Sequence, residues 1–207
     1  MMRLMLITVL SLSATAQAAI VKGTRAFDDC AFADSATMRV GSIETFYGGS
    51  RTVQEALTGP DLGTGFEIGV FDPGEIVEIG FADNQAINLA GPDLIVYEAW
   101  AADGFDVAIG LPQGSFSPYI HFEPADEGII DGAGQNVALI DLASFGLSSG
   151  ATVSRFLIRK DDYDTAELMG VAAINSVPEP AMAALLLTGG LGLLRRRIRR
   201  YGYQTTI

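Results

Sequence analysis

The sequence is short of the residues on which many catalytic and metal centres depend. It contains one cysteine, Cys30, and one histidine, His121, among 207 residues. A single cysteine excludes an intramolecular disulfide, so Cys30 is expected to be buried as a small apolar side chain, with an intermolecular bond as the alternative. A lone histidine with no second histidine or cysteine nearby is seldom a metal or catalytic site.

Basic residues are scarce as well. Between Thr52 and Ser154 there is no lysine or arginine, and the whole chain has a formal net charge of −12. Because nothing in this stretch can neutralise phosphates, the composition argues against nucleic-acid binding. The acidity itself has two interpretations, a solvated acidic surface or a set of ligands for a divalent cation.

Long apolar runs are absent, and the chain has one short uncharged run near each end. Residues 1–18 have the form of a cleavable secretory signal, with Arg3 before the apolar stretch 4–12 and the small residues Ala16 and Ala18 at the cleavage site. This predicts an exported protein that is processed by signal peptidase and whose mature chain begins at residue 19.

The second uncharged run, residues 181–194, is followed by a cluster of arginines. Fourteen helical residues span roughly 21 Å, against about 30 Å of hydrocarbon, so the run predicts a short transmembrane helix. A buried core helix is the alternative. By the positive-inside rule, the tail 195–207 stays cytoplasmic and stops transfer, through Arg195, Arg196, Arg197, Arg199 and Arg200.

The linker 176–180 that precedes this run contains Val177, Pro178, Glu179 and Pro180. Together with the apolar helix and the arginine cluster, this motif resembles the PEP-CTERM sorting signal of exported proteins in Gram-negative bacteria that make extracellular polysaccharide. The resemblance implies recognition and cleavage near Pro-Glu-Pro by an exosortase. It also implies an inner-membrane-anchored precursor that is then moved to the cell surface or released.

Residues 19–175 have the size of one domain and the pattern of an all-β fold. Apolar and polar residues alternate with period two between turns rich in Gly, Pro, Asp and Asn. The alternation predicts that Asp106 faces outward, and residues 141–146 are expected to form one helical turn ended by Gly146. This spacing predicts an antiparallel β-sandwich. The candidate strands are 77–81, 94–98, 105–109, 119–123, 153–158 and 168–174.

Short patches of this domain, 91–98, 103–105 and 170–175, resemble ectodomains found ahead of PEP-CTERM tails. That resemblance implies a jelly-roll-like sandwich akin to carbohydrate-binding modules. The chain departs from it at Glu167, where an aspartate-rich Asp-x-Asp-Ala segment is expected.

Motifs for catalysis are weak. Residues 146–150 fit the Gly-x-Ser-x-Gly esterase pattern, but a helical turn precedes them and a strand follows, so a plain turn is predicted. Paired carboxylates, as a glycosidase needs, cannot be separated from background in so acidic a chain.

Two kinds of binding site remain as hypotheses. Loops rich in carboxylates suit calcium, which takes oxygen ligands, although an abundance of Asp in turns is the alternative. Trp100, just past a strand end, is a candidate platform for sugars, although aromatic residues on strands more often pack in a core. The candidate calcium ligands are Asp83, Asp93, Asp161, Asp162 and Asp164.

The sequence therefore predicts an exported, surface-sorted, non-enzymatic β-sandwich that associates with extracellular polysaccharide or matrix. One alternative is a secreted hydrolase that uses paired carboxylates on matrix polysaccharide. Another is a structural envelope protein without a specific ligand.

Overall fold

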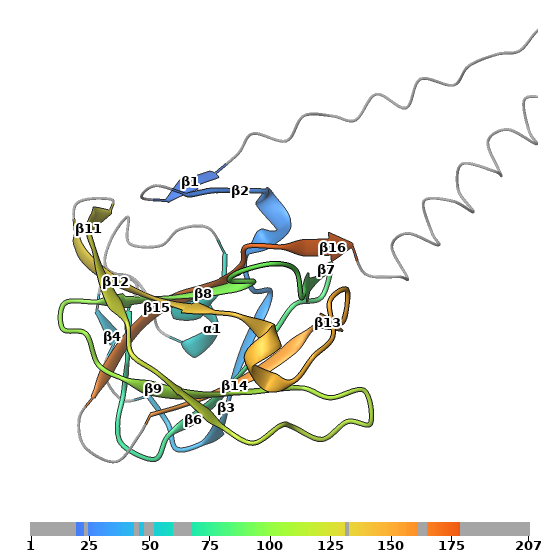
Figure 1. Ribbon diagram of the computed structural model, residues 1–207. Coiled ribbons are helices and arrows are strands. Elements are labelled where there is room, and N and C mark those ends of the chain that lie inside the picture. The colour runs from blue at the N-terminus through green and yellow to red at the C-terminus, as the bar shows by residue number, and fades with distance from the viewer. Residues whose placement is uncertain are drawn as a thin grey trace, which may run out of the picture.

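Two main β-sheets face each other in a computed structural model of the protein, which describes residues 20–22, 25–43, 46–47, 52–59, 68–130, 133–160 and 165–178 (Figure 1). Every described strand pairing is antiparallel. The antiparallel β-sandwich predicted from the alternation is thereby confirmed.

Each main sheet is built from segments that are distant in sequence. The five-stranded sheet has the order β10 (Ile120–Phe122), β9 (Phe105–Ile109), β14 (Arg155–Lys160), β6 (Ile76–Gly80) and β3 (Ser35–Val40). The six-stranded sheet has the order β11 (Ala125–Ile130), β12 (Ala133–Ile140), β8 (Leu94–Ala99), β15 (Ala166–Ala173), β5 (Ile68–Phe71) and β4 (Phe46–Tyr47).

Smaller elements close the edges and ends of the sandwich. The strands β1 (Ile20–Lys22) and β2 (Arg25–Phe27) form a hairpin, and β13 (Thr152–Val153), β7 (Asn84–Ile87) and β16 (Ser176–Pro178) form a third layer at one end (Figure 1). The helices are η1 (Asp29–Ala31), α1 (Val53–Leu57) and η2 (Leu142–Phe145).

The order of pairing follows a jelly-roll scheme. Eight strands form the runs β5-β15-β8-β12 and β6-β14-β9-β10, in which strands early in the chain pair with strands late in the chain. This is the nested arrangement of two four-stranded sheets in a jelly roll. One consequence is that the turn after β8 lies close to the start of β15.

The core between the sheets is formed by the inward side chains of alternating positions. On β9 these are Phe105, Val107 and Ile109, each exposing 1% of its surface or less. Helix α1 contributes Ala56 and Leu57 to the same core, and its Thr52 accepts a hydrogen bond from the Glu55 backbone N–H at 3.2 Å as an N-cap.

A second apolar cluster lies on the outer face of the six-stranded sheet, beneath the N-terminal segment that includes β1, β2 and η1. Phe27 and Phe32 from this segment pack with Tyr97 of β8, which is fully buried. An ion pair of 2.7 Å between Arg25 Nη2 and Glu127 Oε1 ties the segment to β11. This covering was not predicted, because the alternating stretches in the segment are short.

Most of the predicted elements are present with small shifts. The predicted strand 153–158 is divided at Ser154, because Val153 pairs with β7 whereas β14 pairs with β6 and β9. The helical turn at 141–146 is confirmed as η2, ended by Gly146 at φ 77°. Residues 146–150 follow η2 and precede β13, so the predicted plain turn is also confirmed.

Two local expectations need correction. Asp106 points away from the core as predicted, but it is 9% exposed, since Arg159 and His121 cover it. The β structure also continues past residue 175, because Val177 and Pro178 belong to β16 and pair with Gln85 and Asn84 of β7. Proline is tolerated there because β16 is an edge strand of its sheet.

The predicted signal at 1–18 and the tail from Glu179 onward lie outside the described residues. This holds for Pro180, the apolar run 181–194 and the arginine cluster. Within the described ranges, no helix combines the length and the hydropathy needed to cross a bilayer.

Candidate functional site

Trp100, at the turn between β8 and β9, has an unusual backbone and an exposed ring. Its φ is 64°, the one positive value among the described residues other than glycine, and 49% of its surface is exposed. A bulky side chain in the left-handed region costs roughly 1–2 kcal/mol. Such an outlier, held in place by the surrounding structure, points to a functional hypothesis.

Neighbouring strands hold this turn in place. The Trp100 backbone N–H donates to Gly134 O at 3.4 Å, and Asn136 Nδ2 donates to Trp100 O at 3.3 Å. At the other end of the turn, the Asp103 N–H donates to both carboxylate oxygens of Glu98, at 3.2 and 3.0 Å. The turn is therefore anchored at both ends.

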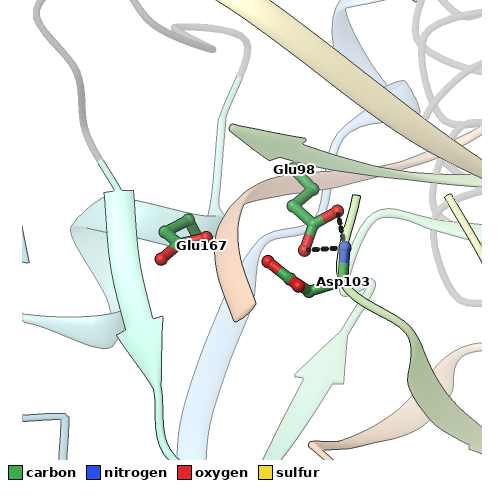
Figure 2. A group of neighbouring side chains, drawn as sticks. All are labelled: Glu98, Asp103 and Glu167. Carbon is green, nitrogen blue, oxygen red and sulfur yellow. Dashed lines mark hydrogen bonds between the residues drawn. The ribbon is translucent and has the colours of Figure 1, made fainter. Parts of the chain in front are cut away.

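Three carboxylates meet beneath the turn. Glu98 from β8, Asp103 from the turn and Glu167 from β15 each place an oxygen within 4.8 Å of the others (Figure 2). The jelly-roll order accounts for this meeting, because Glu98 pairs in register with Leu168 of β15. Asp103 and Glu167 are partly exposed, whereas Glu98 is completely buried.

Burial favours the protonated form of Glu98, the buried member of this group. Burial raises the pKa of Glu98 to about 8, and the negative charges of Asp103 and Glu167 act in the same direction. The hydrogen bonds from the Asp103 N–H and the charge of Lys160 oppose this rise only in part. Lys160 itself is buried, and its Nζ donates to Gly104 O at 2.7 Å.

This group was not recognised from the sequence. Glu98 ends the predicted strand 94–98 and resembles an ordinary polar residue. It is, however, the one charged side chain in the stretch Leu94–Ala99, which is buried throughout. Glu167 was noted only as a departure from an expected aspartate-rich segment. The charge inside the buried run was the signal that could have found the site.

Asp93, a predicted calcium ligand, has another role. It is completely buried, and its Oδ1 accepts from the Leu89 N–H at 2.9 Å and from Asn175 Nδ2 at 3.0 Å. Its Oδ2 accepts from the Leu142 N–H at 3.0 Å. Both carboxylate oxygens thus organise the loops around η2 and the end of β15.

Of the four remaining predicted calcium ligands, the described structure contains Asp83. Asp83 is exposed, and its pKa is raised by partial burial and by the neighbouring carboxylate of Asp34. Asp161, Asp162 and Asp164 lie outside the described residues. Calcium binding therefore stays a prediction, and the described carboxylates that do gather are Glu98, Asp103 and Glu167.

A polar network covers the outer face of the five-stranded sheet. His121 Nδ1 and Nε2 lie 3.0 Å from Asp106 Oδ1 and 2.9 Å from Glu123 Oε1, and these two hydrogen bonds raise the pKa of His121. Arg159 Nε donates to Asp106 Oδ2 at 3.2 Å, and its guanidinium lies 4.2 Å from the centre of the Tyr119 ring. The lone histidine of the sequence is thus part of an ion-pair network.

This network packs closely against the turn that carries Trp100. A Cβ at Gly104 would lie 2.7 Å from His121 Cε1 and Nε2, a contact that real Cβ atoms do not make. A larger residue at this position would therefore require the side-chain ends of His121 and Glu123 to shift.

Glu98 is poorly placed to act as a glycosidase acid. A glycosidase acid must reach the glycosidic oxygen, and the side chain of Glu98 has no exposed surface from which to do so. Asp103 and Glu167 can accept hydrogen bonds from a ligand, while Glu98 positions the turn through Asp103.

Comparisons with known proteins give a distant structural likeness. No protein-family model matches the chain, and no curated protein is similar to it. Among solved structures, the lectin domain of lectinolysin complexed with Lewis B antigen matches at 12% identity and a TM-score of 0.43, over 72% of this chain and 98% of that chain. A histidine mutant of the same domain, complexed with Lewis b, matches at 10% identity and the same TM-score, over 73% and 98%. At these values the likeness assigns neither a family nor a ligand.

Proposed function

We propose that this chain is an exported, non-enzymatic β-sandwich that binds extracellular polysaccharide at the turn between β8 and β9. The observation that carries the proposal is Trp100, half exposed and held at a positive φ in the same turn as the partly exposed Asp103. An indole ring can stack on the apolar face of a sugar ring, as aromatic side chains combine apolar area with fixed geometry. Asp103 and Glu167 then accept hydrogen bonds from sugar hydroxyl groups.

Replacement of Trp100 by glycine tests this proposal without a large change in stability. Glycine adopts φ 64° freely, which offsets the loss of the partly buried ring, so the free energy of unfolding should stay within about 1 kcal/mol. Affinity for polysaccharide should fall about tenfold, the equivalent of about 1.4 kcal/mol. Affinity electrophoresis in gels containing a panel of soluble polysaccharides measures the change.

Leu89→Ala is the matched control, because Leu89 is also exposed, at 44%, but lies at a different loop. It should migrate like the unaltered chain in every gel. The proposal fails if no polysaccharide retards the unaltered chain, or if Trp100→Gly and Leu89→Ala are retarded equally. Release of new reducing ends from any polysaccharide in the panel would favour the hydrolase.

We also propose that the tail acts as a PEP-CTERM sorting signal that an exosortase processes. The support comes from the residues themselves: Val177 to Pro180, the apolar run 181–194 and the arginine cluster occur in the order that the signal requires. The described β16 ends at Pro178, so cleavage near Pro180 would leave this strand and its pairing with β7 in place.

Protein taken from the surface of its host should therefore end near Pro180 and lack residues 181–207. Intact-mass measurement of the mature chain gives the C-terminus directly. Substitution of Pro178, Glu179 and Pro180 by alanine should block release but leave insertion intact, because the apolar run is unchanged. If the surface protein still carries the arginine cluster, the tail is a plain membrane anchor and the sorting proposal fails.

A further inference from the structure

A pocket of about 350 Å³ opens at the turn between β9 and β10, at the end of the sandwich where β7 and β13 lie. It is lined by Gln85, by residues of the turn from Gly110 to Gly114, and by the segment Thr152–Arg155. Its volume lies at the lower end of the roughly 300–1,000 Å³ typical of small-molecule sites, which suits a ligand of monosaccharide size.

The turn that forms one wall of the pocket is held by its own hydrogen bonds. The Leu111 N–H donates to Ser115 O at 2.8 Å, and the Gly114 N–H donates to Leu111 O at 2.9 Å. The Ile109 N–H donates to Ser117 Oγ at 3.0 Å, which fixes the return of the turn to β9. The pocket is therefore formed before any ligand arrives, which lowers the entropy cost of binding.

The charge inside the pocket is opposite to that of the chain. Among the described residues that line it, none carries a carboxylate, and Arg155 is the one with a formal charge. The chain as a whole has a net charge of −12. A single cation at the wall of such a pocket favours an anionic ligand, and the acidic remainder of the surface penalises highly charged ones.

Arg155 is oriented by its neighbours, yet its donors are only weakly engaged. Its guanidinium lies 5.3 Å from the centre of the Phe116 ring, which covers one of its faces. Its nearest carboxylate oxygen, Glu78 Oε1, is 3.6 Å away, too far for a hydrogen bond, whereas Arg39 Nε donates to Glu78 Oε2 at 2.6 Å. Within the described part of the chain, the Arg155 guanidinium makes no hydrogen bond.

The chemistry of these groups selects a particular ligand. A guanidinium presents parallel N–H donors that match a carboxylate bidentately. One arginine balances one negative charge, which favours a carboxylate over a phosphate dianion. The hydroxyl groups of Thr152 and Ser154 and the amide of Gln85 line the same pocket and suit the hydroxyl groups of a sugar.

We propose that this pocket binds a carboxylate-bearing sugar, a uronic acid residue, with its carboxylate on Arg155. The pocket and its cation do not depend on Trp100, whereas the idea that the uronic acid belongs to a polysaccharide rests on the proposed function. The chain thus has two separate sites, one for a sugar face at Trp100 and one for an acidic sugar at Arg155.

Titration of the full-length chain with a short galacturonate oligomer, followed by calorimetry, tests the assignment. The fully methyl-esterified oligomer is the matched neutral ligand, and inorganic phosphate is the matched anion. The acid should bind about tenfold more tightly than its ester, and Arg155→Gln should lose about tenfold in affinity for the acid, since each bidentate pair is worth about 1.4 kcal/mol or more. Arg155→Lys should recover part of this loss, because it restores the charge without the fork.

Arg25→Gln is the matched control variant, because it also removes one positive charge. Arg25 pairs with Glu127 of β11 and does not line the pocket, so acid binding should be unchanged. Equal losses in Arg25→Gln and Arg155→Gln would show a general charge effect and overturn the proposal. Equal binding of acid and ester, absence of acid binding at millimolar concentration, or a preference for phosphate would overturn it as well.

Two further measurements test the location of the site and its independence from Trp100. The amide chemical shifts of Gly110, Gly114 and Ser154 in the unaltered chain should change on titration with the acid. These changes locate the ligand even if a variant folds poorly. Changes confined to other residues would refute the site. Trp100→Gly should retain acid binding while it loses binding of neutral polysaccharide. Failure of the Trp100 experiment therefore does not imply failure of this one.

Discussion

Replacing Asp93 by alanine is expected to lower the free energy of unfolding by about 4 kcal/mol, because three donors around a buried position lose a charged acceptor at once. These donors are the backbone N–H groups of Leu89 and Leu142 and the side-chain amide of Asn175. The carboxylate that they surround has no exposed surface, and its hydrogen bond with the Leu142 N–H is fully buried. For a domain of this size the melting temperature should fall by about 10 °C.

Two variants make this result specific to Asp93. Asp93→Asn keeps one acceptor oxygen and should lose roughly half as much. Asp141→Ala removes an aspartate whose carboxylate accepts one exposed hydrogen bond, from the Ala143 N–H at 2.8 Å, and should cost about 1 kcal/mol or less. Denaturant unfolding measures all three.

The same experiment separates the structural role of Asp93 from the calcium role predicted for it. Unfolding in millimolar calcium and in chelator, at matched ionic strength, should give the same midpoint if Asp93 serves only the protein's own donors. A calcium-dependent midpoint that disappears in Asp93→Ala would restore the metal interpretation.

The unaltered chain is expected to lose stability as the pH rises from about 5 to 8. Glu98→Gln should remove most of this loss. The folded-state pKa of Glu98 is about 8, raised from the ordinary 4.5. Between these values the unfolded chain has released a proton that the folded chain still holds, so the free energy of unfolding falls as the pH rises. Each pKa unit is worth about 1.4 kcal/mol, and local relaxation reduces the sum, so the expected loss is on the order of 3 kcal/mol.

Glutamine has the shape of protonated Glu98 and keeps an acceptor for the Asp103 N–H. At pH 5 the variant should therefore be about as stable as the unaltered chain, and at pH 8 more stable by on the order of 3 kcal/mol. Denaturant midpoints at intervals across this range measure the difference. Parallel pH profiles for the two chains would contradict the buried, protonated state of Glu98.

Other groups titrate in the same window and have to be accounted for. His121, whose pKa is raised by Glu123 and Asp106, also contributes stability that is lost as the pH rises through its folded-state value. A smaller slope should therefore remain in Glu98→Gln. Glu55→Gln, a change at an exposed glutamate of α1, controls for net charge and should keep the full slope.

Alternation along single strands was enough to predict the class of fold. In the segment 105–109, Phe105, Val107 and Ile109 point to the core as the period of two requires, and the glycine at 146 ends its helical turn as predicted. These features depend on residues that are close together in the sequence, so they can be recognised without knowing which strands pair. The scarcity of basic residues is also a property of composition alone.

The sites, in contrast, depend on which strands become neighbours. Glu98 and Glu167 are far apart in the chain and meet only because β8 pairs with β15. Arg155 acquires its pocket because β14 lies beside the turn that follows β9, and Asp93 finds its donors in three separate segments. A buried carboxylate and a solvated one can occupy the same kind of position in an alternating strand, so the sequence pattern does not distinguish them. Local sequence patterns therefore define the β-sandwich class and its turns. Strand pairing, in contrast, defines which carboxylates are buried and favour the protonated form, which organise loops and which can contact a ligand.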